Sequence, residues 1–331
     1  MSETNVDKKV VKNQSEESKK KYDVGSWLVP IVAVLVAMAI AAILIKLQGL
    51  NPIAAYKSLF KTAFGSIEGL GVTLGKSTPL VLSGLAVAVG LRAGLFNIGA
   101  QGQLLSGALA AAWAGVTFEG LPGYIHIPIA LIIGAFFGSL VAGISGFLKA
   151  YRGVHEVITT IMLNSIVMAV ADYLASGKLR EPDQFLTRTS EIAESAKLPI
   201  YGNLPSGFFM AVVLAISIWW ILGRTTSGFR IETVGRNRHA AWYAGIPVKR
   251  TVISAMLISG AIAGLGGAVE TLGITYRYAP AFNLGLGFDG ITIALLGRVH
   301  PIGIIPGVIL IGGMRAGAPI CNLMPALPPK L

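Results

Sequence analysis

Residues 120–148, GLPGYIHIPIALIIGAFFGSLVAGISGFL, contain no Asp, Glu, Lys or Arg. A helix needs about 20 mostly apolar residues to cross about 30 Å of hydrocarbon, so this stretch is long enough to span a membrane. The same four charged residue types are absent from four further stretches, residues 24–45, 93–118, 198–223 and 251–269. Such repetition predicts an all-α, polytopic integral membrane protein.

The composition and the placement of charge support this class. The chain of 331 residues is 53% hydrophobic and 13% charged, against about 25% charged residues in soluble domains. A soluble enzyme, a disordered protein and a nucleic-acid-binding module are therefore excluded. The net charge of +11 is concentrated in residues 224–250, which hold six basic residues and one acid, whereas residues 177–206 hold four of each. Because cytoplasmic loops retain Lys and Arg, this asymmetry indicates membrane orientation, and we expect no nucleic-acid partner.

The chain is expected to contain about eight to nine hydrophobic segments and to begin in the cytoplasm. Residues 1–26 are polar and of mixed charge, which predicts a disordered cytoplasmic tail. Residues 27–318 are expected to form the transmembrane domain, with an outer loop at 177–206 and a cytoplasmic loop at 224–250. The first span covers residues 27–47, residues 51–71 lie along the outer interface, and the next spans cover residues 72–91, 93–116, 124–148, 155–176, 207–223 and 251–272.

The region after residue 272 allows two interpretations. Residues 285–296 and 302–314 are each too short to cross a bilayer alone at about 1.5 Å per residue. Either the first segment begins near Pro280, or the two are broken, re-entrant helices. Elsewhere, the pairs Gly134/Gly138 and Gly260/Gly264 have the spacing of small residues that allows two helices to approach closely.

No catalytic, cofactor or metal site is expected on this chain. Residues 71–77, GVTLGKS, are one residue shorter than the phosphate-binding GxxxxGK[ST] motif, and residues 285–290, GLGFDG, match GxGxxG without a preceding strand. The four histidines are scattered without the spacing of metal ligands. Asp172, Glu270 and Asp289 are candidate intramembrane acids, but all three fall near span ends, which favours an interfacial position.

Amide side chains inside apolar sequence are the strongest candidates for a solute pathway. Asn97, Gln101 and Gln103 lie among small residues at the start of the third span, and Asn164 lies within the fifth. A buried amide without a partner is costly in hydrocarbon, so each must meet another helix or water. Two interpretations stay open at this point: hydrogen bonding between helices, or the lining of a pathway for a neutral polar solute.

Four segments together resemble permease subunits of bacterial ABC importers for nucleosides and simple sugars, a family similar to branched-chain amino-acid permeases. They are LFNIGAQGQ (95–103), HEVITTIMLN (155–164), ETVGRNRHAAWYAGI (232–246) and LLGRVHPIG (295–303). The nucleoside branch is the most similar. The resemblance implies a translocation pore that works with a cytoplasmic ATPase subunit, which binds the ATP, a second permease subunit and an extracellular substrate-binding lipoprotein, all at the cell membrane and in contact with its lipid.

The resemblance also implies that the cytoplasmic loop carries the coupling helix that contacts the ATPase. Asn237 is expected to cap this helix, and Gly245 to end it. The residues expected to couple are Gly235, Asn237, Ala240, Ala241, Tyr243 and Gly245. A stand-alone secondary carrier is the alternative function. The chain departs from the family at residues 319–331, where three further prolines from Pro325 predict an atypical, truncated tail.

Overall fold

The computed structural model describes residues 25–280 and 285–323. Residues 1–24 of the expected disordered tail (1–26) and residues 324–331 of the expected atypical tail lie outside the described residues. The boundary at residue 26 is wrong, because Gly25 and Ser26 belong to helix α2. The chain divides into two compact units, Met1–Tyr56 with Pro328–Leu331, and Lys57–Leu327.

The first unit contains one long apolar helix and the start of a second. Helix α2 (Gly25–Leu47) exposes aliphatic side chains such as Leu35 and Ile43. Helix α3 (Pro52–Phe64) begins at a cap, because Asn51 Oδ1 accepts hydrogen bonds from the backbone N–H groups of Ile53 and Ala54, at 3.0 and 3.3 Å. The Tyr56 hydroxyl donates to the Met38 carbonyl at 2.6 Å, which joins the two helices inside this unit.

The second unit is a bundle of apolar helices. Within residues 25–280 and 285–323 of the whole chain, five helices are long and apolar enough to cross a membrane, α2 with α3 would add a sixth as one broken span, and α12 and α13 are shorter apolar helices. Together with α5, these segments agree with the expected eight to nine. The helices of the bundle are α4 (Ile67–Arg92), α5 (Ala100–Thr117), α6 (Gly123–Arg152), α7 (Glu156–Ser176), α8 (Ser206–Arg224), α11 (Val248–Glu270), α12 (Leu286–Leu296) and α13 (Ile304–Leu323).

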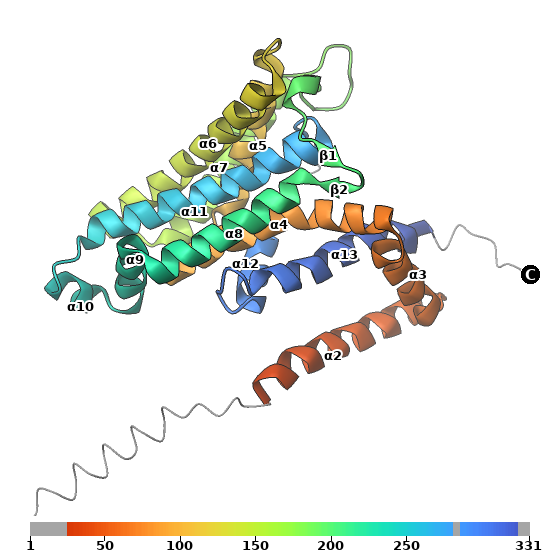
Figure 1. Cartoon of the computed structure of the whole chain (residues 1–331), viewed down its shortest axis with the longest axis horizontal. Coiled ribbons are helices and arrows are strands. Elements are labelled where there is room, and N and C mark those ends of the chain that lie inside the picture. The colour runs from red at the N-terminus through yellow and green to blue at the C-terminus, as the bar shows by residue number, and fades with distance from the viewer. Residues whose placement is uncertain (1–24, 281–284, 324–331) are drawn as a thin grey trace, which may run out of the picture. The chain divides into compact units, whose positions relative to one another are not determined.

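The two long loops lie at opposite ends of this bundle (Figure 1). The 224–250 loop folds into two short helices, α9 (Thr226–Arg236) and α10 (Arg238–Tyr243). The 177–206 loop carries a 3-10 turn at Glu194–Ala196 and a hairpin of β1 (Ile200–Tyr201) with β2 (Leu204–Pro205). The two loops therefore lie on different sides of the bundle, as expected. We call these two ends of the bundle the α10 end and the hairpin end.

Glycine pairs bring three helices of the core into backbone contact. Gly134 and Gly138 of α6 face Gly260 and Gly264 of α11, and Gly107 of α5 packs against Gly264. A Cβ atom added at Gly264 would collide with the carbonyl oxygen of Gly134 and lie 3.0 Å from the Cα of Gly138. The prediction that these pairs permit close helix approach is confirmed.

Two predicted boundaries need correction. The third span does not begin at residue 93, because α5 begins at Ala100 after an irregular segment in which Gly94 has a φ of +67°. A left-handed residue ends a helix, and Gly adopts it without a steric penalty. The last helix, α13, is longer than residues 302–314 and runs to Leu323, into the segment that we expected to be an atypical tail.

The region after residue 272 contains two separate helices, α12 and α13, with residues 297–303 between them. Helix α12 begins at Leu286 after Gly285, whose φ is +87°, so the interpretation that this segment begins near Pro280 is wrong. The eleven residues of α12 run alongside α4, where Gly290 packs on Ser83 and Ile293 on Gly84. A helix this short spans only part of a bilayer, and its ends are tolerated because the rest of the bundle covers them.

Candidate functional site

The first candidate site is the amide cluster, whose four side chains are all at most 4% exposed. Asn97 Nδ2 donates to Gln103 Oε1 at 2.9 Å and to Ser259 Oγ at 2.8 Å. Asn97 Oδ1 accepts from Gln103 Nε2 and from the Gly99 N–H, both at 3.0 Å. Ser259 lies on α11, so this network joins the irregular segment before α5 to the middle of another helix.

The other two amides support the same segment. Gln101 Oε1 accepts a hydrogen bond from the Gly287 N–H at 2.7 Å, which holds the first turn of α12 against α5. Asn164 of α7 accepts from the Gly102 N–H at 2.8 Å and donates to the Ile98 carbonyl at 3.0 Å. These amides therefore satisfy backbone groups that an interrupted helix leaves without partners inside the membrane.

This geometry gives the cluster a structural role between helices, the first of the two interpretations left open by the sequence. Each amide reaches across to an irregular backbone or to a second helix, and the cluster is buried in the bundle. Contact between these amides and a passing solute stays a prediction.

The second candidate site is the short helix α10 in the 224–250 loop. Asn237 caps it as expected, since its Oδ1 accepts from the N–H groups of His239 and Ala240, both at 3.0 Å. At the other end, the N–H of Gly245 bonds to Trp242 O and that of Ile246 to Ala241 O, both at 3.0 Å. Gly245 has a φ of +76°. This is a Schellman motif, and it confirms that Gly245 ends the helix.

The expected coupling residues divide into a buried and an exposed group. Ala241 is fully buried in its own chain, and Gly235 packs against the turn at Arg92 and Gly94. These two residues shape the loop from within. Ala240, Tyr243 and Gly245 are exposed, and the Tyr243 side chain is 82% exposed beside the ring of Trp242. The surface open to a partner therefore centres on the two aromatic side chains.

Arg92, which the sequence analysis did not single out, links this loop to the bundle. Its Nη1 atom lies 3.4 Å from Glu232 Oε1 on α9, and its Nε donates to the Val299 carbonyl at 3.1 Å. Val299 lies in the turn between α12 and α13 and has a φ of +56°, an unusual value for a β-branched residue. One side chain thus joins α9, the end of α4 and a strained turn. The sequence signal that could have identified Arg92 is its position at the end of a predicted span, on the same side as the basic 224–250 loop.

Replacing Gly245 with alanine is expected to destabilise the permease by about 1–2 kcal/mol, because a Cβ atom opposes the left-handed backbone. No atom lies within 4 Å of the added Cβ, so the effect isolates backbone strain. Thermal unfolding in detergent measures it. Gly223→Ala is the control, since Gly223 also has open space but lies in a helix with ordinary φ. An equal melting temperature for both variants would contradict the role of Gly245.

At the hairpin end, ion pairs fasten the 177–206 loop to the chain after α11. Arg277 contacts Glu181 at 3.0 Å and Glu191 at 2.8 Å, and Lys197 contacts Glu191 at 2.7 Å. The hydrogen bond from Lys197 holds the pKa of Glu191 below its usual value. Backbone bonds from Ile192 N to Tyr276 O and from Leu198 N to Leu272 O add to this attachment.

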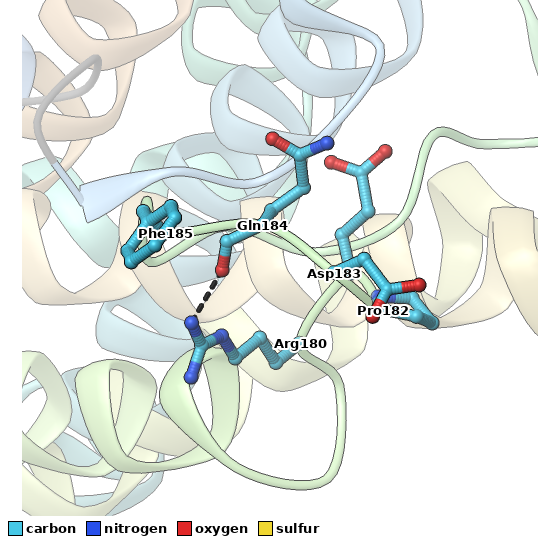
Figure 2. Close-up of a pocket in the computed structure, with 6 residues that line it drawn as sticks. Arg180, Pro182, Asp183, Gln184 and Phe185 are labelled. Atoms are coloured by element: carbon cyan, nitrogen blue, oxygen red, sulfur yellow. Dashed lines mark hydrogen bonds between the residues drawn. The ribbon is translucent and has the colours of Figure 1, made fainter.

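Two of the cavities that the described residues form open at this end. One, of about 480 Å³, is lined by residues 180–185. Figure 2 shows that these side chains project from a single loop, where the Arg180 guanidinium donates to the Gln184 carbonyl oxygen. A cavity made by one loop does not lead into the bundle. The second cavity, of about 430 Å³, lies between α4, the hairpin and the residues after α11, and its lining includes Lys76, Asn203 and Tyr276.

The acids considered as intramembrane charges occupy different environments. Asp172 is exposed on α7, and Asp289 pairs with Arg315 of α13. Glu270 is the last residue of α11, as its expected place near a span end requires, but it is buried within the chain at 3% exposure. Its interfacial position stays a prediction. The 177–206 loop is bonded to the residues that follow α11. The position of the helix end in the sequence did not predict the burial of Glu270. Among the residues that the structure describes, no group of three potential metal ligands occurs.

The residues at 71–77 that resemble a phosphate-binding loop lie within α4 and form no loop. In a continuous helix their N–H groups bond to carbonyl oxygens of the preceding turn, so these groups are not free to surround a phosphate.

Comparison with known proteins defines the class. Residues 70–326 match the family described as the permease component of branched-chain amino acid transport systems, and the chain belongs to this family. No solved structure matches the chain.

Three relatives cover most of the chain. A guanosine ABC transporter permease of Bacillus subtilis is 43% identical over 302 residues, 88% of this chain and 85% of the relative. A nucleoside ABC transporter permease of Lactococcus lactis is 37% identical over 88% and 84%, and a glucose ABC transporter permease of Haloferax volcanii is 32% identical over 88% and 82%. The chain is a multi-pass membrane permease of an ABC importer and not itself an enzyme, and a stand-alone secondary carrier is not favoured.

Proposed function

We propose that the chain forms part of the translocation pathway of an ATP-driven importer of nucleosides, with its N-terminus in the cytoplasm. The observation that carries the substrate class is the 43% identity to a guanosine permease across 88% of the chain. The orientation is supported by the basic 224–250 loop, which lies at the α10 end of the bundle (Figure 1). The hairpin end then faces outward.

The partners follow from this assignment. A cytoplasmic ATPase would bind at the exposed aromatic surface of α10, and the network of Arg92 would transmit its movement to α4 and to the turn between α12 and α13. A second permease subunit would complete the pathway. An extracellular substrate-binding lipoprotein would dock at the hairpin end, where ion pairs hold the 177–206 loop in a defined shape.

The solutes named for the three relatives share one chemical feature. Guanosine, other ribonucleosides and glucose are uncharged and carry hydroxyl groups on neighbouring carbon atoms. We therefore expect the pathway of this chain to accept neutral solutes with vicinal hydroxyls.

Uptake of radiolabelled guanosine by cells with and without this chain tests the substrate class. We expect uptake to depend on the chain and to fall when unlabelled nucleosides are added in excess, but not when glucose is added. Competition by glucose alone would replace the nucleoside assignment with a sugar. The control strain carries the Gln48→Ala variant, which changes only an exposed side chain in the turn after α2.

Replacing Tyr243 with alanine is expected to weaken binding of the ATPase at least about tenfold, because exposed aromatic side chains at the centre of an interface carry much of its affinity. Tyr243 is 82% exposed, so the change leaves the core intact. Co-purification of the ATPase with detergent-solubilised permease measures the effect. Tyr201→Ala, at 67% exposure on the opposite end, is the matched control. Equal recovery of the ATPase with both variants would remove α10 from the interface.

A further inference from the structure

A groove with an apolar lining lies between α5, α6 and α7. Its volume is about 490 Å³, and among the described residues that line it Lys178 alone carries a charge. Small side chains leave this space, since Ala110 of α5 and Ala171 of α7 belong to the lining and are 7% and 1% exposed. The Ser106 hydroxyl, also in the lining, donates to the Gln103 carbonyl within its own helix at 2.8 Å. The groove therefore offers an apolar ligand a surface without unsatisfied hydroxyl groups.

The groove opens on an apolar outer surface of the bundle. Phe137 of α6 and Ile166 and Val170 of α7 line it and are also 43%, 54% and 51% exposed. On the same stretch of α6, the side chains of Phe136 and Leu140 are 56% and 46% exposed. A continuous exposed surface of aliphatic and aromatic side chains marks a membrane or protein contact. In a membrane helix of this composition, the contact is with acyl chains.

The groove extends over about one leaflet of a bilayer. Ile166 is the middle residue of α7, and the lining continues along this helix to Leu174, which is about 12 Å at 1.5 Å per residue. The hydrocarbon of one leaflet is about 15 Å thick, half of the whole core. A pathway for a solute must cross both leaflets. The length of this groove therefore matches an acyl chain that enters from one side.

The hairpin end of the groove has the features of a membrane–water interface. The Ala193 N–H of the 177–206 loop bonds to the Gly115 carbonyl, which places the last turn of α5 at this end. Trp113, one turn from the end of α5, lines the groove, and its ring packs edge-on against Phe118 with centroids 5.8 Å apart. Tryptophan is enriched at the level of the lipid headgroups. A lipid in the groove would therefore have its headgroup beside Trp113 and the residues that follow α7.

Lys178 supplies a positive charge at this level. It is exposed, lies two residues beyond the end of α7 at Ser176, and forms no ion pair with any acid of residues 25–280 and 285–323. Basic residues beside grooves between membrane helices bind anionic lipid headgroups. Asp172 is also exposed on α7, but it is not among the lining residues. The charge of the groove is thus complementary to an anionic headgroup.

We propose that this groove is a specific binding site for an anionic phospholipid of the leaflet at the hairpin end. One acyl chain lies between α5, α6 and α7 against Ala110 and Ala171, and the headgroup phosphate accepts hydrogen bonds from the Lys178 ammonium group. In the orientation proposed above, this leaflet is the outer one. The site is separate from the amide cluster, from the α10 surface and from the cavity beside the hairpin.

Titration of the full-length permease in detergent with phosphatidylglycerol or phosphatidylcholine of identical acyl chains, followed by native mass spectrometry, tests the site. We expect the first phosphatidylglycerol to bind about fivefold more tightly than the first phosphatidylcholine, since one lysine near an anionic lipid surface has an effect of this size. Lys178→Gln should remove this preference and Lys178→Arg should keep it. Lys46→Gln, which removes another exposed lysine in the last turn of an apolar helix, should leave the preference unchanged.

A second pair of variants tests the acyl-chain part of the groove. Val170→Trp fills the groove from an exposed position and should weaken binding of both lipids, whereas Ile144→Trp, at 50% exposure on α6 outside the lining, should weaken neither. Equal affinity of the wild type for both lipids would overturn the proposal, because a cation that acts only on the α7 dipole gives no headgroup preference. A preference that survives in Lys178→Gln would also overturn it. Loss of the second permease subunit from Val170→Trp, with lipid binding unchanged, would assign the groove to that subunit instead.

Discussion

Replacing Gly264 with leucine is expected to prevent the permease from folding into its bundle. Gly264 lies where three helices meet, with Gly134 and Gly138 of α6 on one side and Gly107 of α5 on the other. The atoms that a side chain would strike belong to helix backbones, which cannot move aside as a flexible side chain can. Overpacking a core costs about 1–3 kcal/mol and sometimes more, and we expect at least ~3 kcal/mol here because two helices must separate.

The yield of monodisperse permease in size-exclusion chromatography, together with thermal unfolding, measures this effect. Gly223→Leu is the matched control, since a side chain at this exposed helical position meets no atom within 4 Å. The control should behave as the wild type does. Equal yield and stability for Gly264→Leu would show that α6 and α11 are not in backbone contact in the membrane.

Replacing Asn97 with leucine is expected to have the second-largest effect. The change removes two donated and two accepted hydrogen bonds and leaves buried groups of Gln103, Ser259 and Gly99 without them. Each unsatisfied buried group costs about 1–3 kcal/mol. Ser259 also donates to the Ala86 carbonyl, so part of the network survives. We therefore expect the loss in free energy of unfolding to be smaller than the sum over the three groups.

Comparison of assembly with transport distinguishes the two interpretations of the amide cluster. Loss of folded permease in Asn97→Leu supports the structural role that the hydrogen bonds indicate. Normal assembly with reduced transport would instead place Asn97 on the solute pathway. The control is Gln48→Leu, because Gln48 is an exposed amide in the turn after α2 and lies outside the two loops proposed to bind partners.

Much of the fold could be predicted because membrane helices have a strong compositional signal. The apolar stretches became α6, α7, α8 and α11 with boundaries shifted by a few residues, since a charged or turn-forming residue marks each end. The glycine pairs predicted close helix approach at α6 and at α11, because small residues at four-residue spacing let two helix backbones come together. That these two helices contact each other is seen only in the structure. Asn237 and Gly245 predicted both ends of α10, because cap chemistry is local.

The parts that could not be predicted depend on contacts between distant segments. The start of α5 was misplaced because an irregular apolar segment has the composition of a helix, and only Asn164 and Ser259 reveal what supports it. The burial of Glu270 depends on the 177–206 loop, which is linked to the end of α11 through backbone bonds at Tyr276. Ala241 was expected at a partner surface because it is small, whereas its size serves packing within the chain.

This permease is expected to move its solute only when a separate ATPase hydrolyses ATP. The most direct test reconstitutes the permease in liposomes with its second permease subunit, ATPase and binding protein, and follows labelled guanosine in the presence of ATP or of an ion gradient. We expect concentrative uptake with ATP and the ATPase, and none when the ATPase is omitted. Concentrative uptake driven by the ion gradient without the ATPase would contradict it.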